Sequence, residues 1–109
     1  MKLKFVKAGA TMSDETTPYN VVFDKECTVR EMIEAILKEN PIEYGTIYLR
    51  NKDYEDEWRH EFYGGCPRCD YRRGKISNVN IPEQYMNASV DKVDSCGGWG
   101  VMSYWIYIK

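Results

Sequence analysis

A chain of 109 residues is the size of one domain, and its formal net charge of −2 gives no charge excess that would favour nucleic acid or an anionic membrane. Hydrophobic residues make up 43% and charged residues 29%, a composition that indicates a folded globular protein and excludes a disordered one. Lysines interrupt the apolar residues near the N-terminus, so we expect neither a signal peptide nor a membrane span there. The composition predicts a single domain over residues 1–109, located in the cytoplasm.

The first elements in chain order are two strands. Residues 2–8 alternate polar and apolar side chains, which is typical of a half-buried strand. Residues 9–18 are polar and predict a loop, and residues 19–23 are aromatic and β-branched, as in a second strand. The two strands are expected to form a hairpin with a long connection.

A helix over residues 28–39 is the clearest element. Thr28 and Glu31 have the spacing of a capping box, in which each side chain binds an amide at the start of the helix. Five apolar residues then follow a helical period and predict one buried stripe: Val29, Met32, Ile33, Ile36 and Leu37. Pro41 ends the helix, because the residue before a proline is disfavoured in the α conformation.

The remaining elements are mostly strands. Strands are predicted over residues 45–51, 56–63, 75–81, 89–95 and 101–109, with a short helix from Pro82 and a glycine-rich turn at residues 96–100. In the last strand Met102, Tyr104, Ile106 and Ile108 share one face, but the other face is largely apolar as well. The last strand is therefore expected in the centre of its sheet.

The order of these elements resembles the ubiquitin-like β-grasp superfamily. The segments that carry the resemblance are KLKFVKA, YNVVF, TVREMIEAILKE and the closing YWIYI. The resemblance implies an α+β fold in which a mixed sheet packs on one main helix (residues 28–39), with the first and last strands adjacent and parallel. Residues 52–100 form an elaborated region, and the sequence shows neither the C-terminal Gly-Gly tail nor the four-cysteine loop of β-grasp ferredoxins. The resemblance thus implies a fold and no chemistry.

The segment GGCPRCD, residues 64–70, carries the most specific motif. Cys66 and Cys69 have the spacing of a zinc knuckle, in which a tight turn directs two thiolates at one metal. Cys96 and His60 are the candidates that complete a Cys3His tetrahedron, and zinc held by four protein ligands is structural. Cys27, just before the helix, is expected to be a small buried residue.

Two other interpretations of this motif stay open. In the first, Cys66 and Cys69 lie in a metal-free turn whose geometry the proline and glycines determine. In the second they belong to a thiol-dependent redox enzyme or sensor, although no helix follows them to lower a thiol pKa.

The residues around this motif supply the candidate partner surface. Arginines and aromatic residues are frequent in protein interfaces, and those singled out here are Tyr63, Arg68, Tyr71, Arg72, Arg73 and Trp99. Arg68, Arg72 and Arg73 also define a nucleic-acid hypothesis of lower weight, because an acidic segment precedes them. The chain has one histidine and no recognisable catalytic motif. We therefore expect a small non-enzymatic domain that binds another protein.

Overall fold

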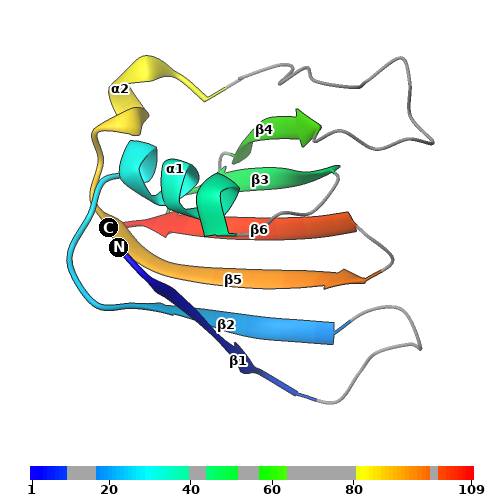
Figure 1. Ribbon diagram of the computed structural model, residues 1–109. Coiled ribbons are helices and arrows are strands. Elements are labelled where there is room, and N and C mark those ends of the chain that lie inside the picture. The colour runs from blue at the N-terminus through cyan, green and yellow to red at the C-terminus, as the bar shows by residue number, and fades with distance from the viewer. Residues whose placement is uncertain (10–16, 40–43, 52–56, 64–80, 99–100) are drawn as a thin grey trace.

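The computed structural model describes residues 1–9, 17–39, 44–51, 57–63, 81–98 and 101–109, and shows an α+β fold (Figure 1). The strands are β1 (Leu3–Lys7), β2 (Thr17–Phe23), β3 (Tyr44–Arg50), β4 (Glu57–Tyr63), β5 (Val90–Gly98) and β6 (Val101–Ile108). The helices are α1 (Val29–Glu39) and the short α2 (Glu83–Met86). The predicted strand at 75–81 falls almost wholly outside the described residues. The predicted α+β class, with one main helix on a mixed sheet, is confirmed.

All six strands form one sheet in the order β1-β2-β5-β6-β3-β4. Neighbouring strands are antiparallel except β3 and β6, which run parallel. β6 lies between β5 and β3, so the prediction of a central last strand is confirmed. The expectation of adjacent first and last strands is wrong, because β2 and β5 lie between β1 and β6.

Helix α1 begins and ends where the sequence predicts. The Glu31 carboxylate accepts a hydrogen bond from the Thr28 backbone amide at 3.0 Å, and the Thr28 hydroxyl accepts one from the Glu31 amide at 3.2 Å. This is the predicted capping box, and it satisfies two of the amides that a helix N-terminus leaves without partners. At the other end Glu39 accepts a hydrogen bond from the Leu3 amide at 2.7 Å, which ties α1 to β1.

The core lies between α1 and one face of the sheet, as Figure 1 shows. Four of the five residues of the predicted helical stripe are buried, and Leu37 packs against the core as a partly buried residue. The sheet contributes a cross-strand row in which each residue pairs with the next: Val21, Val93, Ile106 and Leu49. All four are buried, so α1 excludes solvent from this part of the sheet. The face of the sheet that carries them is called the helix face below.

Helix α2 contacts both strand β4 and helix α1. Pro82 precedes the first residue of α2, as the sequence predicts. Tyr85 stacks on Trp58 of β4 with ring centroids 4.4 Å apart, and Glu83 forms an ion pair with Arg30 of α1. These contacts place α2 on the same side of the sheet as α1.

The glycine-rich segment at residues 96–100 differs from its prediction. Cys96, Gly97 and Gly98 were expected in a turn but continue β5, where Cys96 pairs with Pro18 of β2 and with Ser103 of β6. A strand with partners on both sides satisfies its backbone groups on both edges, and this outweighs the low strand propensity of glycine.

Candidate functional site

The structure describes only part of the site predicted from the sequence. Outside the described residues lie Cys66, Arg68, Cys69, Tyr71, Arg72, Arg73 and Trp99. His60 and Tyr63 belong to β4, where their backbones pair with Ile47 and Tyr44 of β3. Cys96 is a half-buried free thiol in β5.

The strand order does not bring Cys96 and His60 together. Cys96 of β5 pairs with Ser103 of β6, Ser103 pairs with Thr46 of β3, and Thr46 pairs with Glu61 of β4, the residue after His60. Strands β6 and β3 therefore lie between the backbones of Cys96 and His60. Three strand spacings amount to about 14 Å. Two ligands of one tetrahedral zinc have donor atoms about 2.0–2.3 Å from the metal, a geometry that backbones so far apart do not allow. A zinc held by Cys66 and Cys69 can therefore include Cys96 or His60, but not both.

Metal-ligating side chains are scattered over the part of the chain that the structure describes. No three of its His, Cys, Asp and Glu residues form a group that could hold a metal ion. Cys27 is 5% exposed, and burial raises the pKa of its thiol, as does the Glu31 carboxylate nearby. The prediction of a small buried Cys27 is confirmed, and the raised pKa keeps this thiol protonated and unreactive.

The face of the sheet opposite α1, called the open face below, gathers the side chains with the strongest binding character. Both described helices lie on the helix side, whereas the open face carries alternate residues of five strands. The register assigns the following described side chains to it: Lys4, Val6, Pro18, Asn20, Val22, Thr46, Tyr48, Arg50, Lys92, Asp94, Cys96, Ser103, Trp105 and Tyr107.

Trp105 of β6 is the centre of an aromatic cluster on the open face. Its indole stacks on the Tyr48 ring of β3 with centroids 5.5 Å apart and planes inclined by 13°. The Arg50 guanidinium lies over the same indole, 5.9 Å from the ring centroid. On the other side of β6 the Lys92 ammonium lies 4.6 Å from the centroid of the Tyr107 ring. Each ring is thus held by a neighbour across the strand.

Two exposed valines lie on the open face nearer to the β1 edge of the sheet, where Asn20 and Asp94 separate Val6 from Trp105 along one cross-strand row. Val6 is 41% exposed and Val22 is 48% exposed, and they are the exposed large hydrophobic residues of the described chain. Lys4 pairs with Val22, and Asn20 pairs with Val6, so each valine has a polar residue as its partner across the strand. The open face therefore carries an aromatic cluster and two exposed valines, with charged residues of β5 between them.

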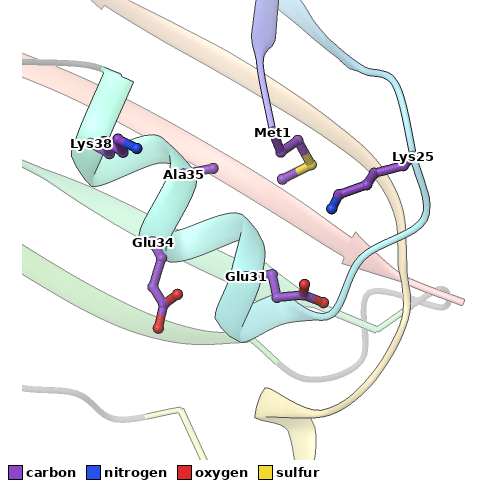
Figure 2. A pocket seen from close by; sticks show the side chains of 6 residues that line it. All are labelled: Met1, Lys25, Glu31, Glu34, Ala35 and Lys38. Carbon is purple, nitrogen blue, oxygen red and sulfur yellow. The ribbon is translucent and has the colours of Figure 1, made fainter.

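The helix side contains a shallow hollow of about 220 Å³ beside α1. Figure 2 shows Met1 and Lys25 on one wall and α1 on the other, with Glu31 and Ala35 projecting toward them and Glu34 pointing away. Lys38 completes the lining, so its acidic and basic side chains balance. Glu31 is already bound to Thr28. The hollow consequently offers no charge preference and few uncommitted polar groups.

The shifted pKa values of the described groups have structural causes. The Thr28 amide and hydroxyl hold the pKa of Glu31 below its ordinary value of 4.5, because they bind the ionised form. A hydrogen bond from Lys109 lowers the pKa of Glu26, and the same contact raises the pKa of Lys109. These shifts come from a helix cap and a surface ion pair, which are structural features of the fold.

Sequence reasoning missed the open face as a site, although it identified one of its signals. The second apolar face of residues 101–109 predicts a strand in the centre of its sheet. The strand is central, but on its open face Trp105 is half-buried, whereas Tyr107 is only 9% exposed. The other members come from strands far apart in the sequence, so only the register brings them together.

Helices long and apolar enough to cross a membrane are absent from the described segments. Comparisons with protein families, with curated proteins and with solved structures find no match to this chain.

Proposed function

We propose that this chain is a small non-enzymatic binding domain, and that another protein docks on the open face of its sheet. The observation that carries the proposal is Trp105, half-buried and in contact with Tyr48 and Arg50 of β3 on a face that no described helix covers. Tryptophan, tyrosine and arginine are the residues that most often dominate the free energy of protein association.

The packing of these rings favours binding. Tyr48 and Arg50 restrict the indole before a partner arrives, so less side-chain freedom is lost on association. Val6 and Val22 add exposed aliphatic side chains to the same face, where they alternate with polar residues.

The sheet edge at β1 is a weaker alternative for docking. β1 has five residues, and its sequence LKFVK places lysines at positions 4 and 7. The Leu3 amide is occupied by Glu39, which removes one of the backbone donors of this edge. Short, lysine-bearing edges resist the addition of a further strand, so the face supports docking better than the edge.

A structural zinc stays part of the proposal. Its ligands are Cys66 and Cys69, joined by Cys96 or by His60. Such a zinc would hold Tyr63 at the end of β4 near the other candidate partner residues, Arg68, Tyr71, Arg72, Arg73 and Trp99. Support for this zinc comes from the C-P-x-C spacing alone. It would stabilise the fold rather than take part in a reaction.

The docking proposal is tested with Val22→Asp, which changes the open face without removing a buried side chain. Proteins that co-purify with the tagged chain from its own cells are quantified for the wild type, for Val22→Asp and for Lys38→Glu, an exposed control on α1. We expect Val22→Asp to lose at least one specific partner that Lys38→Glu retains, with circular dichroism unchanged in both. Equal retention by the two variants would contradict the proposal.

A further inference from the structure

We infer that the Glu39 carboxylate is an autoinhibitory contact at the β1 edge of the sheet, where it prevents β1 from pairing with the β1 strand of a second copy of this chain. Among the described strands β1 pairs with β2 alone, so its other side is an edge of the sheet. An edge strand is a template for a further strand unless something blocks it. The contact acts at this edge and is therefore independent of docking on the open face.

The register of β1 with β2 determines which backbone groups face the free edge. Ala8 lies opposite Pro18, and its amide donates to the Pro18 carbonyl at 3.0 Å. In an antiparallel pair, residues that direct their amide and carbonyl toward the partner strand alternate with residues that direct them away. The even-numbered residues of this strand therefore bind β2, whereas Leu3, Phe5 and Lys7 turn their backbone groups outward.

The Glu39 carboxylate occupies the outward position at Leu3. It accepts a hydrogen bond from the Leu3 amide at 2.7 Å, and Glu39 is half-buried at the end of α1. The helix dipole disfavours a negative charge in the last turn, so a carboxylate here has a cost that this hydrogen bond offsets. The side chains of Leu3 and Phe5 already pack against the core. Strand β1 is thus anchored without Glu39, and the carboxylate adds a blocked donor at the edge.

A second copy of the chain fits this edge once the carboxylate is removed. Two antiparallel β1 strands related by a twofold axis use all three outward positions when Phe5 lies opposite its own equivalent and Leu3 lies opposite Lys7 of the second copy. In this register Lys4 lies opposite Val6, so each lysine faces an apolar residue and like charges are not paired. Because the axis repeats the Leu3 position, one carboxylate per chain blocks two of the three pairs.

The test compares the full-length wild type with Glu39→Ala, Glu39→Gln and Glu34→Ala. Sedimentation equilibrium up to about 1 mM protein measures association. We expect Glu39→Ala to dimerise, whereas Glu34→Ala, an exposed control on the same helix, stays monomeric like the wild type. Glu39→Gln keeps an oxygen acceptor and should also stay monomeric. In dilute Glu39→Ala the Leu3 amide should exchange its hydrogen about tenfold faster than in the wild type, as measured by NMR.

Lys7→Pro shows whether the association uses this edge. The Lys7 amide faces away from β2, so a proline there removes no hydrogen bond within the sheet but removes a donor from the pairing of two β1 strands. The double variant Glu39→Ala, Lys7→Pro should therefore be monomeric. A dimer that persists in the double variant would overturn the inference.

Three further outcomes would also overturn it. A monomeric Glu39→Ala with a faster-exchanging Leu3 amide would mean that the carboxylate only ties β1 to α1. Loss of the native circular dichroism spectrum in Glu39→Ala would mean that the contact is needed for folding. Equal association of the wild type and Glu39→Ala would mean that the carboxylate inhibits nothing.

Discussion

Thr28 and Glu31 cap the first turn of α1 reciprocally, with each side chain accepting a hydrogen bond from the backbone amide of the other residue. The Thr28 hydroxyl oxygen also lies 3.2 Å from the Glu31 carboxylate oxygen Oε1. Since α1 supplies one wall of the core, these two residues determine where that wall begins.

Replacing Thr28 with alanine is expected to lower the free energy of unfolding by about 1 kcal/mol, because the Glu31 amide loses its acceptor. The measurement is urea denaturation followed by circular dichroism, with Thr28→Ser as the control that keeps the hydroxyl. Equal stability of the alanine and serine variants would show that the cap contributes nothing.

Acidification is expected to weaken the same cap. The pKa of Glu31 is lowered in the folded chain, so its contribution is present above the ordinary carboxyl value of 4.5 and is lost as the pH falls through the folded value. The difference in stability between wild type and Glu31→Gln should therefore shrink as the pH falls below about 4.5. The measurement is the urea midpoint of both proteins across this pH range. A difference in midpoint that does not change with pH would contradict the prediction.

Ser95 provides a third prediction, because its buried hydroxyl has no hydrogen-bond partner among the described residues and Ser95 is only 2% exposed. Ser95→Ala removes a polar group whose burial is uncompensated, so we expect the free energy of unfolding to rise, by about 1 kcal/mol. Ser103→Ala on the open face is the control and should change little. A loss of stability in Ser95→Ala would show that the hydroxyl binds a group such as an internal water.

The zinc proposal leads to a prediction about which cysteines matter. Protein purified under reducing conditions should contain zinc, and Cys66→Ser and Cys69→Ser should each lose the metal and melt at a lower temperature. Of Cys96→Ser and His60→Ala, only one should do the same, because two strands separate these residues. Metal content is measured together with the melting temperature. A metal-free wild type, or loss of zinc in both of the last two variants, would contradict the proposal.

Local interactions explain which parts of the fold the sequence predicts. Helix α1 is specified by contacts within four residues of one another, namely the Thr28–Glu31 cap and the apolar stripe, so its limits are readable from the sequence. The central place of β6 is readable as well, because both of its faces are apolar. Strand order is different. The pairing of β6 with β3 joins residues more than fifty positions apart, and no local signal specifies it.

The candidate site follows the same logic. Sequence reasoning favoured loops with clustered arginines and glycines, where the signal is contiguous. The aromatic cluster instead joins Tyr48, Arg50 and Trp105, which alternate with buried residues like those of any half-exposed strand. The prediction of Cys96 in a turn is wrong for a related reason. Its glycine neighbours indicate a turn, and nothing local in the sequence indicates that its strand pairs with β2 and β6.

The central position of β6 has a consequence for the synthesis of this protein. β6 joins β5 to β3, yet it is synthesised after all the other described strands. Until residue 108 has been synthesised, the sheet is in two parts. One part contains β1, β2 and β5, the other contains β3 and β4, and no strand connects them. A chain released before that point would expose two unpaired inner edges, which are templates for aggregation. Folding of the sheet is thus expected to wait until β6 has been synthesised.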